Sequence, residues 1–469
     1  MSKKIILIIF AAFLLRLIAL NQSLWLDEAT TARVVQQYGY LGILTKFSPF
    51  DFHPPLFYWL EKFWTGVFGH SEISLRMPSV LSSLAAGYFV YLIGGVWAAV
   101  FFLFNPLIVY YSQEARMYMM ATMFLTMALY YFLQLSSRQK SESKIRNERF
   151  RLDFGLRRND FLFFLFFITL AFFTFYGSIF LIAAFVIYLF FKKQYNHLFI
   201  CLFVIFVDFL VVSPLLYHQL MNARIVLPTV ANWASVLGKA NLKNLLLIPI
   251  KFSVGRIDFY PKWLYYATAG LWTFFVFFIL LKNSLKTKNL KLKTLLAFLF
   301  VFPLALGFVT SFVTPLLQYF RFIYLIPIMT VILSFGLSNG AEVQPRRLYW
   351  KVPLIAAGFM SFSLIYLLSP QFHREDWKSL VSNLPKDIPI YMIIPSSDPV
   401  KYYNNNIKVN ELRELKSLPV KKLSGEVIVI PYTADIYGFD YKTVLGRDEY
   451  KLKDKKTFRG NLEVMTYSL

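Results

Sequence analysis

The sequence predicts a polytopic α-helical membrane protein with a small α/β domain at its C-terminus. Of its 469 residues, 57% are hydrophobic and 16% are charged, whereas soluble domains are about 25% charged. Apolar stretches recur along the chain, separated by short charged breaks. Beyond Pro370 the pattern changes to short strands and amphipathic helices. We therefore expect a transmembrane domain over residues 1–369 and an extracytoplasmic α/β domain over residues 370–469.

Segment lengths and charge breaks predict about eleven transmembrane helices. The expected spans lie near residues 4–20, 76–93, 96–110, 117–135, 160–175, 178–191, 197–216, 263–281, 294–313, 321–337 and 351–369. The first span carries Arg16 and is not followed by a small-residue cleavage site, which favours an uncleaved helix over a signal peptide. The second and third spans are joined by little more than Gly94 and Gly95.

The distribution of positive charge gives the expected topology. The net charge is +23, but the basic residues bunch between apolar segments, so nucleic acid is not an expected partner. The positive-inside rule places the N-terminus and the basic stretch 136–160 in the cytoplasm. The same alternation places the C-terminal domain outside. The protein is thus expected in the plasma membrane, in contact with membrane lipid.

One outer segment departs from this rule. Residues 217–262 contain a single acid, Asp258, and six basic residues: Arg224, Lys239, Lys243, Lys251, Arg256 and Lys262. Translocated loops usually avoid such an excess. The segment therefore predicts an anionic partner, and lipid headgroups fit that description as well as any other ligand.

The C-terminal region alternates between helical and extended patterns. Residues 376–384, DWKSLVSNL, read as an amphipathic helix, and residues 389–394 and 425–432, PIYMII and GEVIVIPY, read as strands. Such alternation is typical of a small α/β domain.

The first outer loop, residues 21–75, holds the main candidate residues. Asp27 and Glu28 begin the helical pattern LWLDEATTARVVQQY. Acids at a helix N-terminus are favoured by the helix dipole, so a plain surface helix also accounts for them. Asp51 and His53 precede a second short helix, LFYWLEKFWTGVFG, that is rich in interfacial aromatic residues. Both helices are expected to lie at the membrane surface.

Further candidates lie at the outer ends of later spans. Arg76 stands at the outer mouth of the second span, where an arginine can also serve only as a headgroup anchor. Glu114 and Arg116, beside Tyr118, lie in the next outer turn, and an exposed ion pair in a tyrosine belt fits them equally. Arg321 lies at the outer surface between the ninth and tenth spans.

Carboxylates and arginines at one membrane face suit a reaction between a lipid-borne phosphate and a hydroxyl acceptor. A carboxylate accepts the hydroxyl proton, and arginines stabilise the departing phosphate. The five histidines show no metal-binding spacing, so no metal or other cofactor is predicted. The single cysteine, Cys201, excludes an intramolecular disulfide. These features alone do not identify glycosyl transfer.

The sequence resembles the membrane glycosyltransferases of the GT-C fold. It is similar in particular to bacterial relatives of the protein O-mannosyltransferases (dolichyl-phosphate-mannose-protein mannosyltransferases) and of the lipid A aminoarabinose transferase. The matching pieces, in family order from about residue 14 to 381, are LLRLIALNQSLWLDEAT, DFHPPLFYWLEKFW, SLRMPSVL, NPLIVYYSQEARMYMM, QYFRFIYLIPIM and REDWKSLV. The chain departs from the family in the short Gly94-Gly95 link and in FFTFYGSIF, where relatives often carry a histidine.

The resemblance implies a polyprenyl-phosphate-linked sugar as donor and an inverting single displacement. It implies Asp27 as the general base toward the acceptor hydroxyl, with Glu28 in a supporting role. The other implied site residues are Asp51, His53, Glu114, Arg116 and Tyr118, with Arg76 and Arg321 as cations on the phosphate side. Arg16 also matches a family position, although an intramembrane anchor accounts for it too. The sugar, the prenyl chain, the acceptor (protein, lipid or glycan), a metal requirement and the oligomeric state are left open.

Two alternatives from other classes remain. A transporter or lipid flippase would place ionisable residues near the bilayer midplane and would show repeated halves, whereas the acids here gather at the outer surface and no repeat is visible. A non-catalytic envelope protein would not explain the groups of residues around Asp27, His53 and Glu114.

Overall fold

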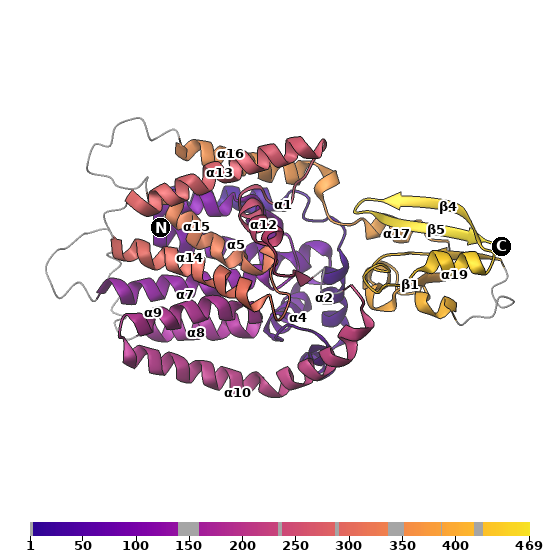
Figure 1. The fold of residues 1–469 in the computed structure, drawn as a ribbon, viewed down its shortest axis with the longest axis horizontal. Helices are drawn as coiled ribbons and strands as arrows, with labels where there is room; N and C mark the ends of the chain where they lie inside the picture. Colours follow the sequence, from indigo (N-terminus) through magenta and orange to yellow (C-terminus); the bar gives the residue numbers. More distant parts are fainter. Residues whose placement is uncertain are drawn as a thin grey trace.

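The computed structural model describes residues 3–138, 159–232, 237–286, 290–335, 351–385, 387–416 and 425–469. A bundle of long helices makes up most of the molecule, and a smaller domain with a β-sheet projects from one end of it (Figure 1). α1 begins at the end of the bundle opposite to this domain (Figure 1). The predicted polytopic helical fold with a C-terminal α/β region is confirmed.

The helices of the bundle and its outer loops have the following bounds: α1 Lys3–Leu17, α2 Leu26–Gln37, α3 Tyr40–Gly42, α4 Leu56–Phe68, α5 Glu72–Leu103, α6 Pro106–Ser112, α7 Tyr118–Arg138, α8 Asn159–Thr174, α9 Ile179–Phe191, α10 Tyr195–Val226, α12 Leu242–Val254, α13 Lys262–Lys286, α14 Leu290–Thr310, α15 Ile326–Ser334 and α16 Lys351–Leu368. Short 3-10 and π helices join them: η1 Ile43–Phe47, η2 Ser48–Phe50, η4 Tyr176–Ser178, η5 Leu227–Thr229, η6 Tyr319–Leu325 and η8 Pro370–Phe372.

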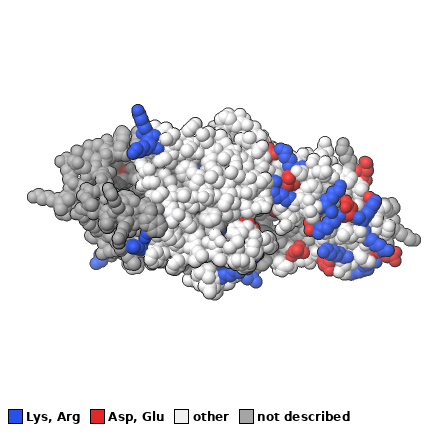
Figure 2. All heavy atoms as spheres, turned by 90° about the horizontal axis from the view of Figure 1, so that it is seen from above, with Lys and Arg blue, Asp and Glu red and all other residues white. Residues whose placement is uncertain are grey.

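Six helices within the described residues are long and apolar enough to cross a bilayer. They lie in α5, α7, α10, α13, α14 and α16. Three shorter apolar helices, Asn159–Thr174, Tyr176–Phe191 and Tyr319–Ser334, coincide with the remaining predicted spans between residues 160 and 335. On the face drawn in Figure 2, Lys, Arg, Asp and Glu are sparse over the bundle and gather on the C-terminal domain. Such an uncharged surface is typical of contact with lipid.

The second and third predicted spans form one element that breaks at Gly95. α5 is interrupted there, because Gly95 has φ 80° and ψ −170°, which only glycine adopts readily. The buried Arg16 of α1 bridges the two halves: its Nε donates to Ser83 Oγ at 2.7 Å and its Nη2 donates to the Leu103 carbonyl at 2.9 Å. Arg16 therefore anchors the first span to a broken helix inside the bundle.

Replacement of Gly95 by alanine is expected to lower the stability of the bundle by about 1–3 kcal/mol, through backbone strain alone. A Cβ at Gly95 would meet no atom within 4 Å, so no steric clash contributes. Gly66→Ala is the matched control, because Gly66 lies inside α4 and its Cβ would also meet nothing within 4 Å. We expect Gly66→Ala to be neutral or slightly stabilising. Thermal unfolding in detergent that moves equally for both variants would contradict this account.

The C-terminal domain is built on a five-stranded sheet with the order β2-β1-β3-β5-β4. β1 runs parallel to β2 and β3, whereas β5 runs antiparallel to β3 and β4. The strands are β1 Ile390–Met392, β2 Val409–Glu411, β3 Glu426–Val429, β4 Lys451–Phe458 and β5 Leu462–Ser468. The helices are α17 Trp377–Ser382, α18 Asp398–Tyr403 and α19 Tyr441–Arg447, with 3-10 turns η9 Ile394–Ser396 and η10 Leu412–Lys416.

The sequence analysis located α17, β1 and β3 but not the hairpin of β4 and β5. β4 is an edge strand whose residues are exposed almost throughout, and its sequence KLKDKKTF has no alternation of apolar and polar residues. Lysines on an edge strand are typical of protection against edge-to-edge pairing. Because lysines occupy half of β4, this strand could not be recognised from an alternation of apolar and polar residues.

The C-terminal domain docks on α2, at the end of the bundle where α2 and α4 lie (Figure 1). Asp398 of α18 pairs with Arg33 at 3.2 Å and accepts a hydrogen bond from Thr30 at 2.8 Å. The hydroxyl of Tyr403 accepts a hydrogen bond from the backbone N–H of Leu24 at 2.8 Å. α2 is therefore held between the membrane helices and the C-terminal domain.

Candidate active site

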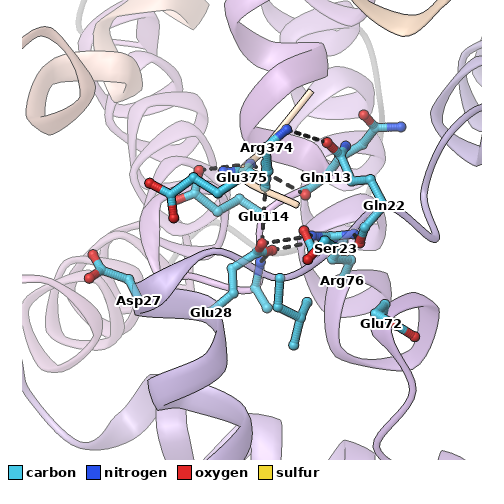
Figure 3. Close-up of polar contacts among 12 residues, drawn as sticks. Gln22, Ser23, Asp27, Glu28, Glu72, Arg76, Gln113, Glu114, Arg374 and Glu375 are labelled. Carbon is cyan, nitrogen blue, oxygen red and sulfur yellow. Dashed lines mark hydrogen bonds and ion pairs between the residues drawn. The ribbon is translucent and has the colours of Figure 1, made fainter. Parts of the chain in front are cut away.

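A fully buried ion pair between Glu28 and Arg76 lies at the centre of the candidate site (Figure 3). Arg76 donates from Nε to Glu28 Oε1 at 2.8 Å and from Nη2 to Oε2 at 2.6 Å. Its Nη1 donates to the carbonyls of Leu20 and Gln22 at 2.8 and 2.6 Å. These contacts fix the chain entering α2 against the N-terminal end of α5.

Arg374, from the segment after α16, joins this ion pair to the turn before α7. Its Nη2 contacts Glu114 Oε2 at 2.9 Å, and its Nε lies 3.4 Å from Glu28 Oε2 (Figure 3). The backbone N–H of Ala115 donates to Glu28 Oε1 at 2.9 Å. One buried cluster, Glu28–Arg76–Arg374–Glu114, therefore ties together α2, α5, the turn before α7 and the start of the C-terminal domain.

The charges in this cluster are set by competition between burial and pairing. Burial acts to raise the pKa of Glu28, but the guanidinium groups of Arg76 and Arg374 lower it below its ordinary value. Burial raises the pKa of Glu114, and Arg374 opposes that rise. Glu28 is thus a charged structural group without exposed surface, and it cannot meet an acceptor hydroxyl.

Asp27, the neighbour of Glu28, has the opposite environment. Its side chain is 38% exposed and lies 3.6 Å from Arg116 Nη2, whereas the side chain of Glu28 is 0% exposed. Consecutive residues of an α-helix point about 100° apart, which lets one acid face the buried cluster and the other face outward. Figure 3 shows Asp27 directed away from the cluster. Asp27 is therefore the carboxylate of this pair that a substrate can reach.

Arg116 links Asp27 to a second acid, Asp51, through the hydroxyl of Tyr58. Its Nη1 donates to the Tyr58 hydroxyl at 3.2 Å, and that hydroxyl donates to Asp51 Oδ2 at 2.8 Å. His53 Nδ1 lies 3.1 Å from Asp51 Oδ1. Burial acts to raise the pKa of Asp51, but the neighbouring His53 and Arg116 and these hydrogen bonds lower it. The structure thus brings Asp27, Arg116, Asp51 and His53 into one polar chain.

Local sequence explains where Asp51 and His53 stand. The two residues lie in the irregular turn between η2 and α4, and Pro54 and Pro55 follow directly before α4 begins at Leu56. Proline biases the preceding residue away from helix and is well suited to a helix start. The predicted short helix is confirmed as α4, which buries Tyr58 and leaves Phe63 exposed at 64%.

Tyr118 and Arg321 are brought together through an aromatic ring. Tyr118 packs edge-to-face on Phe320, with ring centroids 5.3 Å apart, and Arg321 lies 5.8 Å from the same ring. Arg321 is half-buried and donates to the carbonyls of Leu237 and Pro315 at 3.4 Å.

Arg256 was not among the residues singled out from the sequence. It follows α12, and its side chain is exposed. Its Nη1 donates to the Tyr110 hydroxyl at 2.8 Å, and its guanidinium lies 4.8 Å from the Tyr110 ring. Arg374 lies 4.4 Å from that ring. The excess of basic residues in 217–262 was the signal for Arg256, although it did not distinguish this arginine from its neighbours.

Glu375 is a second residue that the sequence analysis did not select. Tyr432 donates to its Oε1 at 2.9 Å, and Trp377 Nε1 donates to its Oε2 at 2.9 Å. Burial raises the pKa of Glu375, and these two hydrogen bonds oppose the rise. The matching piece REDWKSLV contains Glu375, but nothing local in that stretch indicated that it belongs beside α2.

The structure does not support the predicted substrate contacts of two residues, Arg76 and Glu114. Arg76 was expected to meet the phosphate as a cation, but it is 0% exposed, and Glu28 and backbone carbonyls surround its donors. Glu114 was expected to line the site, but it is 1% exposed and pairs with Arg374. Both residues are buried in the ion cluster and do not face a substrate. Within the described ranges, no three His, Cys, Asp or Glu side chains are grouped to hold a metal ion.

The sequence matches the model of one protein family over part of its length. Residues 52–144 match the family described as dolichyl-phosphate-mannose-protein mannosyltransferase. This stretch contains His53, Arg76, Glu114, Arg116 and Tyr118. No curated protein sequence matches the chain.

The fold is similar to that of ArnT from Cupriavidus metallidurans. The crystal structures of ArnT in the apo state and bound to undecaprenyl phosphate both match with a TM-score of 0.59 and 12% identity. Each match covers 99% of this chain and 97% of ArnT. The chain therefore has the ArnT fold from end to end, as its resemblance to membrane glycosyltransferases of the GT-C fold implied.

Proposed function

We propose that the protein is a membrane glycosyltransferase that moves a sugar from a polyprenyl-phosphate donor to an acceptor hydroxyl on the extracytoplasmic side. The match of residues 52–144 to a mannosyltransferase family supports the reaction class. The ArnT fold, which has been solved with undecaprenyl phosphate bound, supports the donor class. The residues around Asp27 supply the groups that such a transfer needs.

The observation that carries the proposal is the position of Asp27. It is an accessible carboxylate in the first turn of α2, 3.6 Å from Arg116 and next in sequence to Glu28 of the buried cluster. A general base has to reach a proton in the substrate and has to be held in place. The cluster of Glu28, Arg76 and Arg374 fixes the helix, while the exposed surface of Asp27 leaves it free to meet a hydroxyl.

The transfer is a single displacement. The acceptor oxygen attacks the anomeric carbon of the donor sugar while Asp27 takes the hydroxyl proton. The bond between the anomeric carbon and the phosphate oxygen breaks, and its electron pair leaves with polyprenyl phosphate. Attack on the face opposite to the leaving group inverts the anomeric configuration.

Arginines stabilise the leaving phosphate. Arg256 is an exposed arginine, and Tyr110 fixes its orientation through a hydrogen bond and a ring contact. Arg321 is half-buried and keeps a partly accessible guanidinium. Preorganised cations at a site of developing negative charge lower the barrier without reorganisation during the reaction. Arg256 thus replaces Arg76 as a cation assigned to the phosphate, and Arg321 keeps the role that the resemblance implies.

Arg256→Gln is expected to lower kcat for donor turnover by roughly 10²-fold, because one preorganised positive charge at the phosphate is lost. The matched control is Lys262→Gln, which removes an exposed charge that pairs with Asp258 in the same outer segment. Both variants should be assayed in lipid vesicles by release of polyprenyl phosphate. Equal rates for the two variants would contradict the assignment of Arg256.

The proposed function itself is tested with the purified wild-type protein reconstituted in lipid. Polyprenyl-phosphate sugars are offered with a crude envelope extract, and released polyprenyl phosphate and labelled product are measured. We expect release coupled to product formation for at least one sugar. A folded protein that releases no polyprenyl phosphate from any donor would contradict the proposal and favour transport.

A further inference from the structure

Two accessible carboxyl groups face the same side of the buried cluster. Asp27 comes from α2, and Glu375 comes from the first residues of the C-terminal domain. Figure 3 shows both carboxyl groups extending to the same side, away from the contacts between Glu28 and Arg76. Glu375 is half-buried, so part of its side chain remains open to a ligand.

Glu375 is held rigidly from two directions. Trp377 and Tyr432 donate to its two oxygens at 2.9 Å each. The turn between β4 and β5 packs on its backbone: a Cβ at Gly460 would come within 2.7 Å of Glu375 Cα, and Arg459 Nε donates to the Arg374 carbonyl at 2.9 Å. A side chain fixed in this way is preorganised for recognition.

The partners of Glu375 leave acceptor capacity unused. Trp377 and Tyr432 are both uncharged, and within the described part of the chain Glu375 forms no ion pair with a Lys or Arg. A carboxylate has about four lone-pair positions, so it can accept further hydrogen bonds beyond these. Glu375 therefore keeps positions for donors that a ligand supplies.

Neither the cap of α17 nor the buried ion cluster uses Glu375. The N-terminus of α17 is capped by the next residue, Asp376, whose Oδ1 accepts from the Ser379 N–H at 3.1 Å. The buried ion cluster uses the preceding residue, Arg374. Glu375 stands between these two residues, and its own side-chain contacts are the hydrogen bonds from Trp377 and Tyr432.

Glu375 lies near the residues at both ends of the proposed reaction. Its carboxyl group extends to the same side of the buried cluster as that of Asp27 (Figure 3). The preceding residue, Arg374, and the phosphate-side Arg256 lie 4.4 and 4.8 Å from the same Tyr110 ring. In the proposed reaction, Asp27 contacts the acceptor hydroxyl and Arg256 contacts the donor phosphate. The donor sugar lies between the acceptor hydroxyl and the phosphate during transfer.

We propose that the C-terminal domain completes the donor site, with Glu375 and Tyr432 binding hydroxyl groups of the lipid-linked sugar opposite Asp27. This inference rests on the proposed function and extends it, since it assigns sugar recognition to the α/β domain. The Glu375 carboxylate accepts hydrogen bonds from ring hydroxyls, and the aromatic face of Tyr432 offers an apolar surface beside it.

Ligand binding by an inactive protein tests the inference. In an Asp27→Asn background in lipid nanodiscs, binding of undecaprenyl phosphate is compared with binding of its mannosyl, glucosyl and 4-amino-arabinosyl forms. We expect Glu375→Gln to weaken binding of at least one sugar-bearing lipid roughly tenfold, the worth of one charge-assisted hydrogen bond. Binding of undecaprenyl phosphate itself should stay unchanged.

Two further variants make the result specific. Tyr432→Phe removes only the hydroxyl that donates to Glu375 and should weaken the same sugar-bearing lipid to a smaller extent. This variant also decides the matter if Glu375→Gln does not fold. Glu411→Gln is the matched control, because Glu411 is a carboxylate of the same domain that pairs with Arg413 at 2.7 Å.

The outcomes separate this inference from the proposed function. Equal loss for lipids with and without sugar, or no loss for any of them, would overturn sugar recognition by Glu375 even if the wild-type protein transfers sugar. Selective loss of sugar-bearing lipid without any turnover by the wild-type protein would support recognition and overturn the transferase.

Discussion

Asp27→Asn is expected to abolish sugar transfer, with a fall in rate of roughly 10²–10⁴-fold, while the protein stays folded. Asparagine keeps the shape of the side chain but cannot take the proton from an acceptor hydroxyl. Stability should change little, because the Asp27 side chain is 38% exposed and its contact with Arg116 is a long one, at 3.6 Å.

The measurement is donor turnover in reconstituted vesicles, with wild type and Asp27→Asn compared at equal amounts of folded protein. Release of polyprenyl phosphate by the wild type but not by the variant would support Asp27 as the base. Turnover at the wild-type rate would remove Asp27 from the mechanism, whatever the donor.

Glu28→Gln, one residue further along, is expected to destabilise the protein by about 3–5 kcal/mol, because removal of one partner leaves a buried charge uncompensated. Glu28 is fully buried and accepts from Arg76 and from the backbone N–H of Ala115. A glutamine would turn an amide N–H₂ toward these donors. Arg374 would also lose one of its two carboxylate partners.

Thermal unfolding and size-exclusion chromatography in detergent distinguish the two substitutions. Both replace a carboxylate by an amide in the same turn of α2, so each serves as the matched control for the other. We expect Asp27→Asn to unfold near the wild-type temperature and Glu28→Gln to unfold well below it. An unchanged unfolding temperature for Glu28→Gln would contradict the structural role assigned to the buried cluster.

The sequence by itself determined the class of the protein. Lipid offers no hydrogen bonds to the backbone, so long apolar stretches have to form helices, and their pattern is visible without a structure. The turn before α4 was also visible, because two prolines after His53 act through local backbone sterics. The Gly94-Gly95 link between two predicted spans coincides with the break in α5, because Gly95 adopts a positive φ.

Composition did not reveal which polar residues are accessible. Asp27 and Glu28 are adjacent acids at a helix start, and only packing turns one of them into a buried partner of Arg76. The resemblance ranked Asp27 ahead of Glu28, but it also assigned Arg76 to the phosphate. Burial of the Arg76 guanidinium excludes direct contact with a substrate.

Tertiary structure alone decided which distant segments meet around the buried cluster. Arg256 follows α12, and Glu375 lies in the matching piece REDWKSLV, where nothing local marked it as a site residue. Hydropathy and motif spacing act over a few residues, whereas the exposure of a charge depends on every element packed around it. Local sequence patterns therefore predict the helices and identify the candidate acids, whereas packing decides which of these acids a substrate can reach.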